Sequence, residues 1–300
     1  MISGVINVYK EKGYTSHDVV AKLRGILRQK KIGHTGTLDP QAEGVLAVCL
    51  GSGTKLCDML TDTGKTYEAV LLLGKTTDTQ DTSGNLQKES SVTCTADDAA
   101  KKLRSFIGEY DQIPPMYSAR KVQGKKLYEL ARAGVEVKRT PQRVAIYDIQ
   151  IREISLPEIV FSVSCSKGTY IRTLCHDVGE ALGCGGCMKS LKRTRVGEFE
   201  IADSLKLSEI EKLREEGTLM ERIYPVDSMF PQLARIHILP EHERLLKNGN
   251  PLGCRQIKET VTTKIGSRIR VYDTEDIFCG IYAWNEEKKI FVPEKMFLGI

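Results

Sequence analysis

The chain has 300 residues, of which 41% are apolar and 28% charged, so it can bury one large core or two unequal ones. No apolar run approaches the length of a membrane span, and the first eight residues lack the basic start and long apolar core of a secretion signal. We therefore expect a cytoplasmic protein whose nine cysteines, an odd number, remain free thiols.

The formal net charge of +5 is concentrated in one segment. Residues 119–143 carry eight lysines and arginines against two glutamates, which makes this segment +6 and leaves the remaining chain near −1. A basic segment on a nearly neutral body indicates local contact with a polyanion such as nucleic acid. The alternative is a solvated helix face, which is common for charge runs of this size.

The first half of the chain mixes strand and helix patterns. Strands are expected at residues 4–8, 45–50 and 67–73. The helical spacing of apolar residues after Ser16 predicts a first helix, which Ser16 or Asp18 can cap. A polar loop is expected at 76–85 and a helix at 97–107, whose apolar side includes Leu103, Phe106 and Ile107.

The second half begins with the basic segment, which the Pro114-Pro115 break opens. Strands are expected at residues 144–154 and 159–165, and helices after Lys167-Gly168-Thr169 and at 208–216. After Pro231 the pattern changes to a short helix at 241–246 and three β-type runs at 268–272, 277–284 and 289–292. About 65 residues of this kind are enough for a separate small β-rich module.

The most constrained turn of the chain runs from Gly33 to Pro40 and contains a single carboxylate, Asp39. Glycines at 33 and 36 permit backbone conformations that other residues avoid, and Pro40 biases Asp39 towards an extended conformation. An aspartate presented by a rigid turn beside a strand is a candidate nucleophile or base. The alternative is an Asx turn that only ends a helix.

This turn, Gly-His-Thr-Gly-Thr-Leu-Asp-Pro at 33–40, closely resembles the TruB family of tRNA pseudouridine-55 synthases. Further matches follow in the family's order: Thr15-Ser16, Lys65-Thr66-Tyr67, Pro114-Pro115 with Tyr117-Ser118-Ala119, Lys167-Gly168-Thr169-Tyr170-Ile171-Arg172 and Leu191-Lys192-Arg193-Thr194. The resemblance covers residues 4 to about 230, and the remaining tail resembles a PUA domain, an RNA-binding module. Several motifs in register over two hundred residues make the resemblance highly specific.

The resemblance implies an α/β (α+β) pseudouridine-synthase fold with a central mixed, mainly antiparallel sheet flanked by helices and loops. It implies a catalytic domain at 1–232, with an RNA-gripping basic insertion at about 110–143, and a PUA-like domain at 233–300. The implied activity is an intramolecular transfer in which uracil leaves its ribose, rotates and rejoins through carbon 5. Such a standalone enzyme uses no cofactor and no metal, and we expect a monomer with tRNA as its partner.

Three residues match the family's catalytic positions. Asp39 matches the nucleophilic aspartate, and Arg172 matches the arginine that keeps this carboxylate charged against the effect of burial. Tyr67 matches the tyrosine that stacks on the target base and assists removal of the proton from carbon 5. From the residues alone, Arg172 reads as an ordinary ion-pair partner and Tyr67 as a core aromatic.

Further residues match positions that bind the substrate, which is a uridine extruded from the T arm of tRNA. His34 matches the residue that enters the space left by the base, and Tyr170 and Leu191 match the walls of the base pocket. Lys10 and Thr37 are also expected at the substrate. The expected contacts to the RNA backbone are Arg120, Lys121, Lys125, Lys126 and Arg193.

Two alternative functions stay open from the sequence: a subunit of a guide-RNA-dependent synthase, and a tRNA-binding or tRNA-folding protein without catalysis. Two further patterns are weak. Cys184 and Cys187 form a C-x-x-C pair, but no second closely spaced pair completes a zinc site. Residues 51–55 resemble a phosphate loop but lack its Gly-Lys-Ser/Thr ending.

Overall fold

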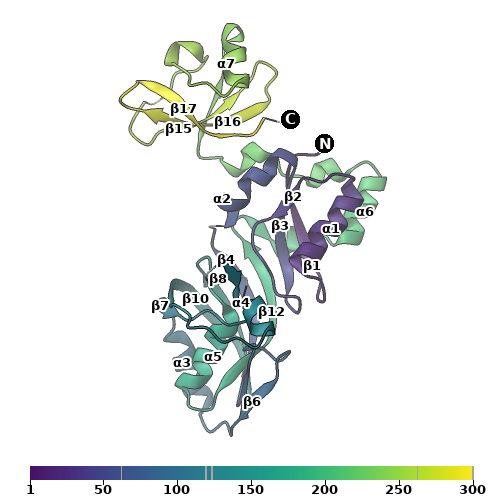
Figure 1. Cartoon of the computed structure of the whole chain (residues 1–300), viewed down its shortest axis with the longest axis vertical. Helices are drawn as coiled ribbons and strands as arrows, with labels where there is room; N and C mark the ends of the chain where they lie inside the picture. The colour runs from purple at the N-terminus through teal and green to yellow at the C-terminus, as the bar shows by residue number, and fades with distance from the viewer. Residues whose placement is uncertain (62, 119, 123, 262, 299–300) are drawn as a thin grey trace.

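The computed structural model describes residues 1–61, 63–118, 120–122, 124–261 and 263–298 (Figure 1). A mixed sheet of nine strands organises the first part of the chain, and a four-stranded sheet lies near the C-terminus. In Figure 1 the smaller sheet forms a separate lobe at one end of an elongated molecule. The fold class expected from the sequence, a mixed and mainly antiparallel sheet with helices and a small β-rich C-terminal domain, is confirmed.

The nine-stranded sheet has the order β1–β3–β12–β4–β11–β10–β7, while β2 pairs with β3 and β13 with β12. Its strands are β1 Gly4–Lys10, β2 Ile32–His34, β3 Glu43–Leu50, β4 Lys65–Leu73, β7 Gly108–Gln112, β10 Gln142–Ser155, β11 Glu158–Cys165, β12 Gly186–Val196 and β13 Phe199–Glu200. Only the contact between β3 and β12 is parallel, and it joins two residue pairs, at Glu43 and Gly44 of β3. Strand β2 pairs with the other end of β3, on the same edge as β12. The segment that links β2 to β3 therefore lies where β3 meets β12.

Helices cover the sheet in two groups. Helices α1 (Ser16–Leu27) and α6 (Leu207–Glu215) pack on β1 and β3, and they form one apolar core with these strands. Helices α3 (Ala96–Arg104) and α5 (Ile171–Ala181) pack on the half of the sheet that contains β4, β10, β11 and β12. The second core also includes Tyr67 and Leu191, two of the residues predicted to line the base pocket.

The C-terminal lobe has its own apolar core and a defined junction with the larger part. Its strands are β14 Ala234–His237, β15 Arg268–Tyr272, β16 Phe278–Asn285 and β17 Ile290–Met296. The short helix α7 (Glu243–Lys247) lies between β14 and β15. At the junction Ile281 and Phe297 join a core cluster that contains Phe230. The Tyr272 hydroxyl also donates a hydrogen bond to the Asp227 carboxylate at 2.6 Å.

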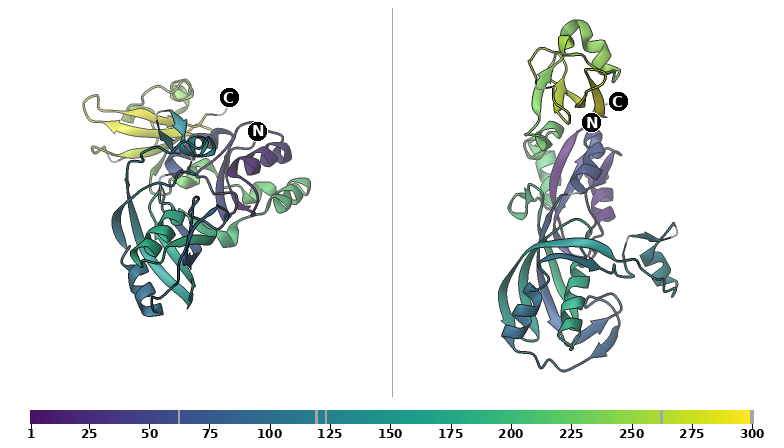
Figure 2. Two further views of the ribbon diagram at one scale, coloured as in Figure 1. Left: turned by 60° about the horizontal axis from the view of Figure 1, so that its bottom comes forward. Right: turned by 90° about the vertical axis from the view of Figure 1, so that its left-hand side faces the viewer.

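The described residues between β7 and β10 project away from the sheet, as the right panel of Figure 2 shows. This projection contains the hairpin of β8 (Lys121–Val122) with β9 (Lys125–Lys126) and the short helix α4 (Leu127–Arg132). The remaining short elements are helix α2 Cys57–Thr61 and the hairpin of β5 Lys75–Thr77 with β6 Leu86–Glu89. Among the described residues no helix is both long enough and apolar enough to cross a membrane.

Most expected elements are present with their ends moved by a few residues, but two expectations are wrong and one strand was not expected. The cap of α1 is Thr15, whose hydroxyl accepts the Asp18 N–H while the Asp18 carboxylate accepts the Thr15 N–H. Helix α3 ends at Arg104, so Ile107 is not part of its buried side and is 44% exposed. The sequence analysis also missed β12, the strand that joins the two halves of the sheet.

Candidate active site

The segment that links β2 to β3 carries Asp39 and is tied to the rest of the sheet at several points. The Thr35 N–H donates to the Ala47 carbonyl at 3.1 Å, and the Gly13 N–H donates to the Pro40 carbonyl at 2.8 Å. The Leu38 N–H donates to the Ser16 hydroxyl at 2.9 Å, which fixes the turn to the first residue of α1. Each tether satisfies a backbone group that a turn would otherwise leave to water, so the turn is held in one conformation.

Asp39 forms a two-point ion pair with Arg172, which lies in the first turn of α5. The Arg172 Nε lies 2.9 Å from Asp39 Oδ2, and its Nη2 donates to Oδ1 at 3.3 Å. The arginine side chain is 5% exposed, whereas the aspartate side chain is 36% exposed and remains open to a ligand. A paired geometry of this kind is typical of an ionised carboxylate and orients it strongly.

The protein environment acts on the pKa of Asp39 in opposing directions. Burial raises the pKa above its ordinary value, and the neighbouring carboxylate of Asp81 adds to the rise. The positive charges of Arg172 and Lys10 oppose it. Removing the arginine would therefore leave a carboxylate that takes up a proton more readily.

Asp81 is a second acidic residue at this site, and the sequence analysis missed it. Its Oδ2 lies 3.8 Å from Arg172 Nη1, and its side chain is 14% exposed. Arg172 also donates to the backbone carbonyls of Thr79, at 3.0 Å, and Tyr117, at 2.8 Å. The polar 76–85 segment therefore helps to hold the guanidinium. This segment has the same mixture of Thr, Asp and Gly as the Asp39 turn, and that likeness could have indicated Asp81 as a site residue.

Three side chains predicted to surround the target base lie on or beside neighbouring elements. Tyr67 on β4 and Leu191 on β12 are 7% and 8% exposed, and both belong to the core that α5 covers. Tyr170 immediately precedes α5, and its main chain is held by Gln112, which accepts the Tyr170 N–H at 2.7 Å and donates to its carbonyl at 3.0 Å. Burial raises the pKa of Tyr67 to about 12, so its phenol is protonated at neutral pH.

His34 and Thr37 lie on either side of Thr35 and Gly36 in the turn. The Gly36 N–H donates to His34 Nδ1 at 3.3 Å, and the His34 ring meets the ring of His17 edge to face at 5.7 Å between centroids. Burial and the charges of His17 and Arg193 lower the pKa of His34 to about 4, so this ring is neutral at physiological pH. The Thr37 side chain is exposed.

The structure buries two cations that were predicted to contact the substrate or the RNA backbone. Lys10 is fully buried, and its Nζ donates to the carbonyls of Glu11, Tyr14 and Pro40. The bond to Pro40 holds the end of the Asp39 turn in place. Burial lowers the pKa of Lys10 to about 8. Arg193, predicted to contact the RNA backbone, is 1% exposed and has no surface for a phosphate. Arg193 is buried because it lies on β12, a central strand of the sheet. The charged residues next to it in the sequence gave no sign of this burial.

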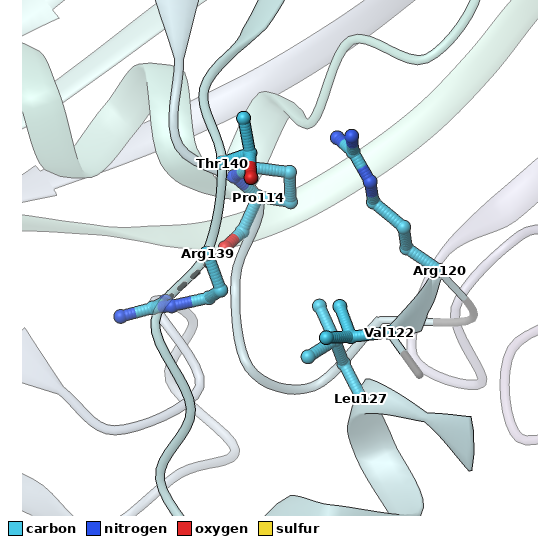
Figure 3. Close-up of a pocket in the computed structure, with 6 residues that line it drawn as sticks. All are labelled: Pro114, Arg120, Val122, Leu127, Arg139 and Thr140. Carbon is cyan, nitrogen blue, oxygen red and sulfur yellow. Dashed lines mark hydrogen bonds between the residues drawn. The ribbon is translucent and has the colours of Figure 1, made fainter. Parts of the chain in front are cut away.

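The remaining predicted RNA contacts lie in the projection between β7 and β10. This projection contains a cavity of about 230 Å³. In Figure 3 Arg120 and Arg139 lie on two sides of it, with Val122 and Leu127 at its wall. The Arg120 guanidinium donates to Gln142 Oε1 at 2.9 Å, and Arg139 donates to the Pro114 carbonyl at 3.1 Å. Lys125 is exposed, whereas the side chains of Lys121 and Lys126 fall outside the part that the structure describes.

Cys184 and Cys187, which form the C-x-x-C pattern, are both buried. Within the residues that the structure describes, no three His, Cys, Asp or Glu side chains lie close enough together to share a metal ion.

Comparison with solved structures defines the class of fold. The chain aligns over 99% of its length with a chain of the Cbf5–Nop10–Gar1 complex, covering 85% of that chain with a TM-score of 0.71 at 28% identity. It aligns equally well, with a TM-score of 0.70 at 25% identity, with a chain of an H/ACA ribonucleoprotein bound to a substrate RNA that contains 2′-deoxyuridine. That alignment covers 98% of this chain and 85% of the other.

Comparison at the level of sequence defines the family. The model of the TruB family pseudouridylate synthase N-terminal domain matches residues 24–171, and that of the tRNA pseudouridylate synthase B C-terminal domain matches residues 172–231. A tRNA pseudouridine synthase B of Lachnoclostridium phytofermentans is 53% identical over 99% of this chain and all of the relative. One of Alkaliphilus oremlandii is 44% identical over 90% of each chain. The chain therefore belongs to the TruB family of pseudouridylate synthases.

Proposed function

We propose that this protein isomerises uridine 55 in the T arm of tRNA to pseudouridine, and that it does so without a guide RNA. The observation that carries the proposal is the Asp39–Arg172 pair, a partly exposed and oriented carboxylate beside a buried guanidinium. Relatives of 53% and 44% identity named tRNA pseudouridine synthase B support the same substrate.

In this proposal Asp39 attacks the target nucleotide as a carboxylate, which divides a difficult rearrangement into easier steps. The bond between N1 and the ribose breaks, the uracil turns, and a new bond forms between C5 and C1′. The proton on C5 then leaves, and N1 takes up a proton, so the product is an isomer of the substrate. The arginine keeps Asp39 charged until the nucleotide arrives.

The uridine must leave the stacked T loop before Asp39 can reach it, and unstacking costs a few kcal/mol. Tyr67, Tyr170 and Leu191 are proposed to hold the extruded base by packing. The neutral ring of His34 is proposed to fill the space that the base leaves in the RNA, and a neutral ring stacks among bases without a desolvated charge. Thr37, exposed on the same turn, is proposed to contact the neighbouring ribose or phosphate.

Contacts away from the pocket offset the cost of extrusion. Arg120 and Lys125 on the projection are proposed to bind phosphates of the T arm, together with Lys121 and Lys126. We also propose that residues 1–232 form the catalytic unit and residues 233–300 a PUA-like module that adds RNA contact. The single chain is proposed to act as a monomer in the cytoplasm.

The guide-dependent reading has less support. The chains of the H/ACA ribonucleoprotein structures are 25% and 28% identical to this protein, well below the tRNA pseudouridine synthase B relatives. A protein that only binds or folds tRNA would need neither the paired Asp39 nor the buried cations beneath it.

Tritium release tests the proposal directly. A tRNA transcript labelled with tritium at C5 of uridine is incubated with the purified protein alone, and with an Asp39→Asn variant of equal thermal stability. Release of about one equivalent per tRNA by the unaltered protein, and none by the variant, is the expected result. Release only after addition of a guide RNA would support the guide-dependent reading. Binding of tRNA without any release would leave a tRNA-binding function.

A further inference from the structure

Arg193 lies beside Tyr67, one of the residues proposed to hold the base. It belongs neither to the Asp39–Arg172 pair nor to the proposed RNA contacts. It occupies β12 directly opposite Tyr67 on β4, so the two side chains share one face of the sheet. Its positive charge therefore lies beside the Tyr67 phenol and lowers the pKa of that group. The same side chain donates from Nε to the Val45 carbonyl at 2.7 Å and from Nη2 to the Gly36 carbonyl at 3.1 Å.

The charge of Arg193 has no carboxylate partner within 4.0 Å among the residues that the structure describes, although the side chain is 1% exposed. A buried guanidinium without a counter-ion is costly, so neutral packing would be the more stable choice if only structure mattered. Its positive charge instead acts on ionisable side chains near the proposed base pocket. It lowers the pKa of both Tyr67 and His34, in the first case against the larger effect of burial.

We propose that Arg193 is a positioning residue for removal of the C5 proton: it holds the Tyr67 hydroxyl against the target base, stabilises the phenolate, and fixes the Asp39 turn through Gly36. This assignment rests on the proposed isomerase function and adds to it a residue that couples the nucleophile's turn to the proton acceptor. One planar side chain with several donors in a fixed fork suits that task, and a lysine does not.

The proton step balances as follows. The Tyr67 phenol gives its proton to water, and the resulting phenolate takes the proton from C5 of the newly formed C-nucleoside. The electron pair of the C5–H bond becomes the C5–C6 double bond, and the electron pair of the C6–N1 double bond takes a proton from water at N1. Tyr67 is again a phenol, no net proton is consumed, and a label on C5 ends on an exchangeable hydroxyl.

A purely structural role predicts a different behaviour, and the two can be separated. If Arg193 only supports β3 and the turn, its replacement lowers activity equally whether or not residue 67 has a hydroxyl. If it also acts through Tyr67, the loss becomes smaller once that hydroxyl is gone. A double-mutant cycle measures this difference, because residues that act through one another are not additive.

The experiment measures single-turnover tritium release at saturating enzyme, so that the rate does not depend on the active fraction. Arg193→Lys keeps the charge without the fork, and Arg193→Met keeps the length without the charge. We expect rates lower by about 10-fold and about 100-fold, within the range of proton-transfer catalysis. In a Tyr67→Phe background, where only the contacts of Arg193 with the turn and β3 remain, the same two changes should lower the rate by a factor at least about five times smaller.

Equal losses in both backgrounds would overturn the proposal and leave Arg193 a structural residue. Where Tyr67→Phe is too slow to measure, 3,5-difluorotyrosine placed at position 67 decides, because its more acidic phenol forms a phenolate without help. Recovery of Arg193→Met by at least about 10-fold supports the proposal, and no recovery overturns it. Absence of release by the unaltered protein would instead remove the proposed isomerase function.

Discussion

The Asp39 turn and the basic projection between β7 and β10 are both connections between strands, yet they are built in opposite ways. The turn is braced from below by two buried cations, Lys10 and Arg193, and its carboxylate is paired with a third, Arg172. In its described part the projection has a short hairpin and the six-residue helix α4, and Lys125, Arg132 and Lys138 are exposed. One connection is fixed before any ligand arrives, and the other presents charge.

This difference follows from what each region has to do. Chemistry requires reacting groups within a few tenths of an ångström, so the structure spends buried charge and backbone hydrogen bonds on the turn. Contacts to phosphates are long-range and tolerate small displacements, so a surface of mobile, hydrated cations is sufficient. The comparison therefore predicts that single changes will have large effects at the turn and small ones on the projection.

The largest effect is expected for Asp39→Asn, which keeps the size of the side chain and removes its charge. Pseudouridine formation should fall by at least about 10³-fold, because no other group can form the intermediate. Affinity for tRNA, measured by filter binding, should change by less than about threefold, because the carboxylate contributes no attraction to a polyanion. A variant that is stably folded and still releases tritium at the original rate would remove Asp39 from the mechanism.

The next largest effect is expected for Arg172→Gln. The rate should fall by about 10²-fold, and the acid limb of the pH–rate profile should move to higher pH. The sign follows from Asp39: its reactive form is the carboxylate, its folded-state pKa is already raised by burial, and Arg172 opposes that rise. Activity is therefore lost as pH falls through the pKa of Asp39. Without the guanidinium this pKa is higher, so the loss begins at a higher pH. An unmoved acid limb would contradict this account.

The turn could be predicted from sequence because its information is local. Gly33, Gly36 and Pro40 restrict the backbone around one carboxylate, and that pattern needs no knowledge of the rest of the fold. The contact of Asp39 with Arg172 joins residues 133 positions apart. Nothing in the local pattern contains it, and only the resemblance to a family suggested it.

The missed strand β12 and the unexpected burial of Arg193 have a common physical cause. Two register irregularities, near Met188 and Arg193, interrupt the alternation of inward and outward side chains along this strand. The sequence pattern therefore does not show that Arg193 points into the core while its neighbour Lys192 pairs with Glu43. Burial of a charged residue depends on acceptors from distant segments, which sequence spacing does not reveal.

A change of backbone rather than charge tests how tightly the turn region is fixed. Gly44 begins the crossing of β3 and β12 with φ of +107°, and an added Cβ would lie 2.2 Å from the Arg193 carbonyl oxygen. Gly44→Ala should therefore lower the free energy of unfolding by at least about 2 kcal/mol, measured by denaturant titration. Gly25→Ala is the matched control, because it lies in α1 with open space around it and should stabilise by up to about 1 kcal/mol. Equal stability of the two variants would mean that the crossing is not closely packed.

The smallest effect is expected on the projection, for Lys125→Gln. Loss of one phosphate contact should weaken tRNA binding only a few-fold at moderate salt and reduce the slope of log affinity against log salt by about 1. The rate at saturating tRNA should not change, because the residue lies outside the fixed part of the site. Lys212→Gln is the matched control: this lysine lies on α6 with its side chain 74% exposed, and its loss should leave the slope unaltered. If Lys125→Gln instead lowered the saturated rate, the projection would belong to the preorganised part of the enzyme, and the contrast between the two connections would fail.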